Sequence, residues 1–220
     1  MARITRKPSA IRREEIALAI LRIVGERGIA ALSTATLSEE VGMTSGALFR
    51  HFASREEMIQ EAAQHALRKL ESTFPDEGLP PLERLLALAD NRVRTVGTDP
   101  GVNWMVGSDE ACHHLPPATC RQLTELVERT KRFVLDALHE GATQGVIRQD
   151  IEPNVLFVPV MGTIHALIGM RGAHSTANRS GDCATGRVLA ALALLLAPEG
   201  GGQAGFRTRP RHGNQEGEDT

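Results

Sequence analysis

The sequence predicts an all-α protein of about nine helices, with a small N-terminal head and a larger helical body. Apolar residues recur three and four positions apart along most of the chain, which is the spacing of a buried helix face. Glycine and proline separate these segments, and no alternating apolar and polar run indicates a strand. With 220 residues, the chain is long enough for two domains.

The head is expected to begin with a basic arm and one helix. Residues 1–13 carry five basic side chains and no acid, so they are a candidate DNA-contacting arm or else a solvated start. The helix is expected over residues 9–27 and ends before Gly28. Its apolar face is formed by Ile16, Ile20, Ile23 and Val24.

Residues 33–57 carry the most specific pattern in the chain. Ser33 can cap a short helix and Gly42 can end it in the left-handed conformation. Thr44 or Ser45 can then cap a second short helix, whose exposed face is small at the front and basic behind. This is the layout of a helix-turn-helix motif, in which the second helix enters a DNA groove.

A longer helix is expected directly after the motif. Ser54 and Glu57 have the spacing of a capping box, which predicts the start of this helix. The breaker-rich segment TFPDEGLPP, residues 73–81, then predicts a boundary between head and body. The expected parts are a DNA-binding domain at 1–54, a connecting helix at 55–72, a helical body at 73–197, and a Gly-rich, disordered tail at 198–220.

The segment GMTSGALFRHFASREEMI, residues 42–59, resembles the signature of the tetracycline-repressor (TetR) family of bacterial transcription regulators. Phe49 stands where the family usually has Tyr, which removes one phosphate hydrogen bond worth about 0.5–1.5 kcal/mol. Arg55 replaces the usual Lys and keeps its charge. The residues that match in order and spacing are Gly42, Thr44, Gly46, Leu48, His51, Phe52, Ser54 and Glu56.

The resemblance implies which residues contact DNA. Threonine, serine, histidine and arginine side chains around the motif fall where the family contacts phosphates, and the small residues and Arg50 fall where base edges are approached. Because few of these side chains can read a base directly, we expect DNA shape to contribute to specificity. The expected DNA-binding residues are Thr34, Thr44, Ser45, Gly46, Ala47, Phe49, Arg50, His51 and Arg55.

The body is expected to hold five helices and one loop. The helices are expected at about 82–97, just after Pro100, and at about 117–144, 153–171 and 182–197, with a loop at 109–117. The last two helices are too apolar to face water. We expect them to pack against the same pair of a second chain in a two-fold, four-helix interface, as the resemblance also implies. Burial within one chain is the alternative. The expected interface residues are Val155, Leu156, Val160, Ile164, Leu167, Val188, Leu192 and Leu195.

The resemblance also implies that the body at 73–197 is an effector-binding and dimerisation domain with a pocket among its helices. Ligand binding there would move the connecting helix and separate the heads. Aromatic residues are few, so we expect an apolar or amphipathic small-molecule effector. The candidate pocket residues are Trp104, Met105, Phe133, Met161 and His165, each of which has ordinary core packing as its alternative.

The three cysteines predict free thiols in a reducing cytoplasm, because their number is odd and no signal peptide precedes them. A metal or thiol sensor formed by Cys112, His113, His114 and Cys120 is an alternative. The two cysteines are eight residues apart, which is wider than in common zinc pairs. We therefore expect neither a metal nor a cofactor.

Other function classes fit the sequence less well. No catalytic motif or phosphate-cradling glycine loop is present, so we do not expect an enzyme. The longest apolar stretch, residues 155–170, is shorter than the roughly 18 residues of a spanning helix and contains Pro159, so we expect no membrane association. A pI near 6.5 leaves a non-specific architectural DNA-binding protein as a remote alternative. The sequence thus predicts a cytoplasmic, ligand-responsive, sequence-specific regulator, a repressor that its effector releases from a palindromic operator.

Overall fold

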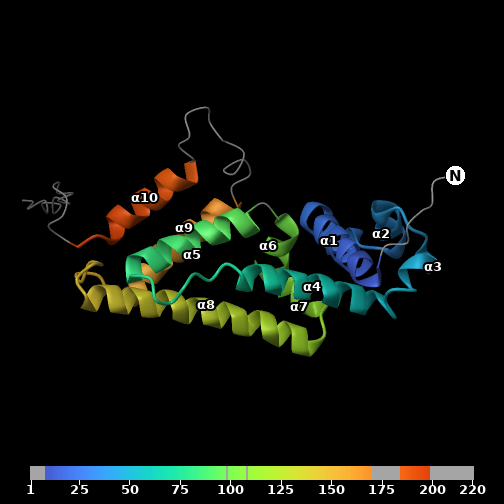
Figure 1. The fold of residues 1–220 in the computed structure, drawn as a ribbon, viewed down its shortest axis with the longest axis horizontal. Helices are drawn as coiled ribbons and strands as arrows, with labels where there is room; N and C mark the ends of the chain where they lie inside the picture. Colours follow the sequence, from blue (N-terminus) through green and yellow to red (C-terminus); the bar gives the residue numbers. More distant parts are fainter. Residues whose placement is uncertain (1–7, 98, 108, 170–183, 199–220) are drawn as a thin grey trace, which may run out of the picture.

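The computed structural model describes residues 8–97, 99–107, 109–169 and 184–198. Over these ranges the protein is entirely helical, with ten α-helices and no strand, which confirms the predicted fold class (Figure 1). The helices are α1 (Ser9–Arg27), α2 (Thr34–Val41), α3 (Ser45–Leu48), α4 (Arg55–Glu71), α5 (Pro81–Val96), α6 (Pro100–Gly107), α7 (Asp109–His113), α8 (Pro117–Thr143), α9 (Pro153–Gly169) and α10 (Ala184–Leu196), with one 3-10 turn at Ile29–Ala31.

The tenth helix is the short α7, which lies in the segment expected to be a loop. The paired prolines at 116 and 117 favoured a loop, but the single helical turn ends before them. The remaining helices begin and end within a few residues of the predicted bounds, and Pro153 opens α9 as expected.

The helix caps of the head are those that the sequence predicts. The hydroxyl of Ser33 accepts a hydrogen bond from the Thr36 amide at 3.0 Å, and Gly42 ends α2 with φ 63° and ψ 38°. Thr44, rather than Ser45, caps α3 and accepts from the Ala47 amide at 3.2 Å. The turn between α2 and α3 is therefore fixed by local hydrogen bonds on both sides.

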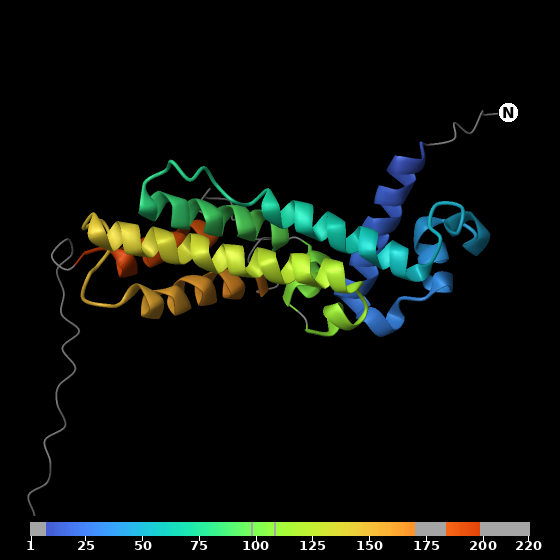
Figure 2. The same cartoon turned by 90° about the horizontal axis from the view of Figure 1, so that it is seen from below.

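The helices form an elongated molecule with α1, α2 and α3 at one end (Figure 1). The α4 helix leads from this end into the body and lies beside the first half of the long α8 (Figure 2). One core cluster joins the head to α4, α6 and the start of α8, and a second joins α5, α9, α10 and the rest of α8. The side chains of Phe74 and Ile168 pack against both clusters.

A second contact, besides α4, joins the head to the body. Helices α1 and α6 cross with their backbones in contact at Gly25 and Gly101. A Cβ atom on Gly101 would lie 2.0 Å from the carbonyl oxygen of Leu21. The crossing therefore requires glycine, because no side chain fits between the two helices.

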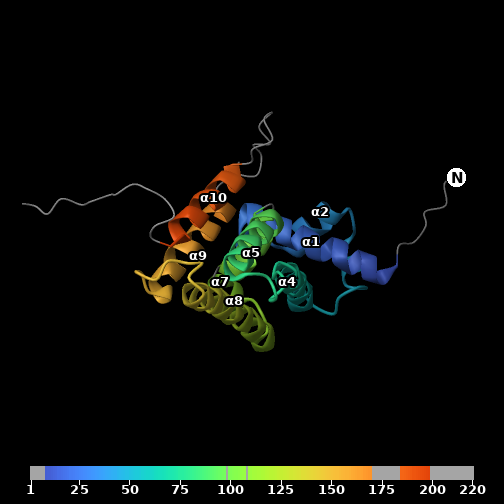
Figure 3. The ribbon, with the colours of Figure 1, turned by 60° about the vertical axis from the view of Figure 1, so that its left-hand side comes forward.

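The structure corrects part of the expected dimer interface. Five of the eight residues face the chain's own core, because α9 packs on α5 and α8, and α10 packs on α5 beside α9 (Figure 3). These five are Leu156, Val160, Ile164, Leu167 and Leu192. The other three, Val155, Val188 and Leu195, are exposed, as are Val158 and Leu194 beside them.

The expectation of free thiols is wrong for two of the cysteines. Cys112 in α7 and Cys120 in α8 form a disulfide, with their Cα atoms 5.3 Å apart. The chain reverses direction at the Leu115–Pro116 corner between the two helices, which the expected loop did not predict. The third cysteine, Cys183, lies outside the described residues.

Several other expectations fall on residues outside the described ranges. These are the first seven residues of the basic arm, the loop at 173–182 and the tail from residue 199 onward. Within the described ranges, no helix is long and apolar enough to cross a membrane. The described residues also contain no group of three or more His, Cys, Asp or Glu side chains that could hold a metal ion.

Candidate nucleic-acid interface

The α3 helix presents one face to the core and the other to solvent. Leu48 and Phe52 are buried, which anchors the helix and the turn after it against the head. On the opposite side, the backbone at Gly46 is open, with no atom within 4 Å of the position that a Cβ would take. This side can approach the backbone of another molecule closely. Its exposed residues are Thr44, Ser45, Gly46, Phe49 and Arg50, with Ala47 half-buried among them.

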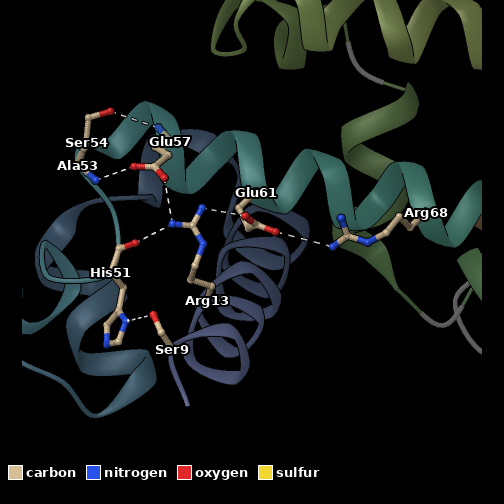
Figure 4. Close-up of polar contacts among 8 residues, drawn as sticks. All are labelled: Ser9, Arg13, His51, Ala53, Ser54, Glu57, Glu61 and Arg68. Carbon is tan, nitrogen blue, oxygen red and sulfur yellow. Dashed lines mark hydrogen bonds and ion pairs between the residues drawn. The ribbon is translucent and has the colours of Figure 1, made fainter. Parts of the chain in front are cut away.

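Arg13 of α1 holds the end of this motif against α4 (Figure 4). Its Nη1 donates to the backbone carbonyl of His51 at 2.7 Å and to Glu57 Oε1 at 2.9 Å. Its Nη2 donates to Glu61 Oε2 at 2.9 Å, and the guanidinium carbon lies 4.1 Å from the centroid of the Phe52 ring. One side chain therefore joins three segments: α1, the turn after α3 and the first two turns of α4.

The charges around Arg13 reinforce each other. Burial lowers the pKa of Arg13, but its hydrogen bonds and charge attraction to Glu61 and Glu57 outweigh burial and raise it above its ordinary value. The backbone amide of Ala53 and the guanidinium of Arg13 together lower the pKa of Glu57. Glu61 Oε1 in turn lies 3.8 Å from Nη2 of Arg68, about two helical turns further along α4. The head is thus connected to the last turn of α4 by a chain of charged groups.

The start of α4 is capped almost as predicted. The hydroxyl of Ser54 accepts from the Glu57 amide at 3.2 Å. The Glu57 carboxylate accepts from the Ala53 amide at 2.6 Å, one residue before the position that a capping box uses. The helix thereby begins at a fixed point directly after the exposed face of α3.

Three further predicted DNA contacts lie around this point. Thr34 and Arg55 line the same small hollow between the starts of α2 and α4, where Arg55 Nη2 donates to the Leu32 carbonyl at 3.2 Å. His51 Nδ1 lies 3.1 Å from Ser9 Oγ of α1. The structure therefore brings all nine predicted DNA-binding residues to one end of the molecule.

Sequence reasoning missed the role of Arg13. It appeared only as part of the basic arm, whereas its side chain is partly buried and fully engaged within the head. Arg12 likewise pairs with Glu15 at 2.7 Å. The carboxylates at 57 and 61, four residues apart on one face of a helix, were the available signal that a cation packs across them.

The structure does not bring the five candidate effector residues together. Trp104 and Met105 pack in the core cluster shared with the head. Phe133 and Met161 pack against the other cluster. His165 lies on the exposed side of α9, where partial burial and the charge of Arg92 lower its pKa.

The geometry of the head defines a helix-turn-helix DNA-binding protein, and comparisons with known proteins identify its family. Residues 16–62 match the sequence profile of "Bacterial regulatory proteins, tetR family". Over these residues the head is a TetR-family DNA-binding domain, and the chain as a whole is similar to TetR-family transcriptional regulators, a class of DNA-binding proteins that are not enzymes.

The relatives and structural neighbours agree with this. The transcriptional repressor KstR2 of Mycolicibacterium smegmatis is 27% identical over 162 residues, which cover 71% of this chain and 78% of that protein. KstR2 of Mycobacterium tuberculosis is 25% identical over 149 residues, covering 66% and 74%. A crystal structure of AibR with isovaleryl coenzyme A and operator DNA superposes with a TM-score of 0.67 at 17% identity, covering 84% of this chain and 98% of that one. The structure of the M. tuberculosis KstR2 gives 0.66 at 20% identity, covering 84% and 95%.

Proposed function

We propose that the protein is a homodimeric repressor that binds a palindromic operator through α3 and leaves it when a small amphipathic effector binds the body. The single observation that carries this proposal is the exposed face of α3, which the Arg13 network joins to the connecting helix α4. Anything that moves α4 relative to α1 must act on the position of α3. The nine predicted residues are the proposed DNA contacts, with Arg50 reading base edges and Arg55 contacting phosphate.

A dimer is proposed because one chain presents one recognition helix, whereas a palindrome offers two half-sites. The outer faces of α9 and α10 support this, since they expose apolar side chains to solvent side by side. Leu194 is 79% exposed and Val158 is 67% exposed. The proposed interface is therefore the outer row Val155, Val158, Val188, Leu194 and Leu195.

An amphipathic effector is proposed from two observations on similar proteins. AibR was crystallised with isovaleryl coenzyme A and operator DNA, and KstR2 is described as a ketosteroid regulator. Both names point to ligands with an apolar part, and coenzyme A adds a charged one. The apolar body of this chain is compatible with such a molecule, and α4 is the proposed lever between effector and DNA.

The predicted division of the chain remains part of this proposal, with a DNA-binding domain at 1–54, the connecting helix and an effector-binding body at 73–197. A cytoplasmic location is proposed because operator DNA is the partner. The metal-responsive alternative loses its support, since Cys112 and Cys120 form a disulfide and offer no thiolate to an ion. The thiol-responsive alternative stays a prediction.

The proposal is tested by selecting DNA fragments from a random pool with the purified protein and measuring binding to the selected site. Arg55→Ala should weaken binding to selected and random DNA alike, since a phosphate contact carries no sequence information. Arg50→Ala should cost about 1–3 kcal/mol on the selected site and relax its sequence preference. Lys131→Ala, which removes the same charge from the exposed surface of α8, is the matched control and should bind as the wild type does. If Lys131→Ala weakened binding as much as Arg50→Ala, the assignment of the interface to α3 would be wrong.

A further inference from the structure

The body contains a buried cation without a carboxylate partner. Arg92 of α5 is only 9% exposed. Its Nε donates to Thr73 Oγ1 and its Nη2 to Thr130 Oγ1, both at 2.8 Å. Burial lowers its pKa to about 10, so the side chain still carries its charge at neutral pH. Among the described residues no acid pairs with it, and both of its hydrogen-bond acceptors are neutral hydroxyls.

A charge held in this way is costly unless something compensates it. The guanidinium has five N–H groups and uses two of them in the bonds to threonine. Its Nη1 donates to no residue in the described ranges and is not fully buried, so this donor is available to a ligand. Partial burial, and after it the charge of Arg92, lower the pKa of His165, so the positive charge of Arg92 also acts on the α9 side. An anion brought by a ligand would satisfy both the charge and the remaining donors.

Phe74 connects this buried cation to the protein surface. Its ring, in the connection between α4 and α5, lies 5.4 Å from the guanidinium carbon of Arg92 and 4.5 Å from that of Arg129. Arg129 lines a surface groove of about 530 Å³ between α4 and α8, together with Arg68, Arg132 and the acids Glu71 and Glu125. Arg129 pairs with Glu71 at 3.2 Å, and the three arginines leave the groove with an excess of positive charge. Arg129 and Arg132 also line an adjoining hollow of about 200 Å³. The half-buried ring of Phe74 therefore contacts both the buried cation and an arginine of this arginine-lined groove.

Arg92 also holds the end of α4. Thr73, which accepts from Arg92, donates its hydroxyl to the carbonyl of Leu70 in the last turn of α4. Asn91, the neighbour of Arg92, donates to the Thr73 carbonyl at 3.1 Å. On the other side, Thr130 belongs to α8. What binds Arg92 therefore acts on the contact that fixes α4 to α5 and α8.

We propose that Arg92 binds the anionic group of an amphipathic effector. The effector reaches Arg92 from the arginine-lined groove past Phe74, and its binding weakens the hydrogen bond between Arg92 and Thr73 at the end of α4. This inference rests on the proposed function and names the chemical class of its effector: an apolar body carrying a carboxylate or a phosphate. A fatty carboxylate and an acyl-coenzyme A thioester are the two sources of that chemistry.

The test is calorimetric titration of the full-length protein, without DNA, with decanoate, decanoyl-coenzyme A and uncharged 1-decanol. Arg92→Met is the informative variant, because it keeps an apolar chain of similar length and removes the charge. It should fold, since Thr73 and Thr130 still donate to the carbonyls of Leu70 and Leu126. Arg94→Gln, which removes a charge from the exposed side of the same helix, is the matched control.

The wild type and Arg94→Gln should bind decanoate, decanoyl-coenzyme A or both with equal affinity, and the anion that binds identifies its source. Arg92→Met should bind that anion at least about tenfold more weakly and bind decanol like the wild type. Phe74→Ala keeps Arg92 in place and should accelerate anion association in stopped-flow measurements.

Two results would overturn the site: no binding of either anion to the wild type, or unchanged anion affinity in Arg92→Met, whether or not that variant is less stable. An unchanged association rate in Phe74→Ala would overturn the route. Because the titration contains no DNA, ligand binding and operator binding are measured separately. A wild type that binds the anion but no operator refutes the proposed repressor function and leaves the anion site standing. A wild type that binds an operator but neither anion refutes this site alone.

Discussion

The crossing of α1 and α6 offers a sharp test of how head and body are joined. In Gly101→Ala, the new Cβ would lie 2.0 Å from the Leu21 carbonyl oxygen and 2.4 Å from its carbon. An ordinary C···O contact is about 3.3 Å or more, so the two helices must separate by about 1 Å or more. Because the clash is with backbone, no side-chain rotation relieves it. The overpacking cost should lie near the upper end of about 1–3 kcal/mol, and the higher helix propensity of Ala offsets at most about 1 kcal/mol of it.

The net loss of about 2 kcal/mol should lower the midpoint of thermal unfolding by about 4–8 °C for a chain of this size. Circular dichroism during heating measures the midpoint, and urea unfolding gives the free energy. Gly107→Ala, on the same helix with no atom within 4 Å of the added carbon, is the control and should unfold at or slightly above the wild-type temperature. Equal midpoints for Gly101→Ala and Gly107→Ala would refute the claim that the two backbones touch.

Three other predictions concern separate parts of the molecule. Arg13→Met removes the donor to the His51 carbonyl and should lower the free energy of unfolding in urea by about 1 kcal/mol after screening. It should also weaken DNA binding. Arg12→Met removes only a local ion pair with Glu15 and should affect stability and DNA binding less. Leu194→Glu should give folded monomers by light scattering, because Leu194 lies in the proposed interface. Leu192→Glu should instead unfold the protein, because Leu192 is only 2% exposed and a charge would be buried there. A dimeric Leu194→Glu variant would place the interface elsewhere. Burial, followed by the charges of Lys69 and Arg68, lowers the pKa of His65, so the folded state favours the neutral ring. The unfolded state therefore binds a proton more readily, and the free energy of unfolding decreases as the pH falls below about 6.5, the ordinary pKa of histidine. The temperature of the unfolding midpoint should therefore decrease when the pH is lowered from 7.5 to 5.5, and it should decrease less in His65→Leu. Equal decreases in the wild type and the variant would exclude this histidine as the cause.

Local patterns predicted the head well because its structure is determined locally. The caps at Ser33, Thr44 and Ser54 and the left-handed glycine at 42 each act within four residues, so their spacing is visible in the sequence. The all-α fold class followed from periodicity in the same way.

Long-range pairings could not be predicted in this way. Arg13 lies 44 and 48 residues from its carboxylate partners, and Arg92 lies 38 residues from Thr130. For α9 and α10, the sequence showed that the helices are apolar but not which face packs inward, since both faces carry similar side chains. The Cys112–Cys120 disulfide depends on a chain reversal between two helices, one of which was expected to be a loop.

The central claim is that two copies of the exposed face of α3 bind one palindromic operator. Hydroxyl-radical footprinting on a DNA fragment selected by the purified protein, combined with the mass of the complex, tests it most directly. We predict two protected half-sites related by two-fold symmetry, with their centres about one helical turn or a whole multiple of it apart, and an even number of chains for each fragment. A single protected site that binds one chain, or protection spread along the DNA without a preferred sequence, would contradict it.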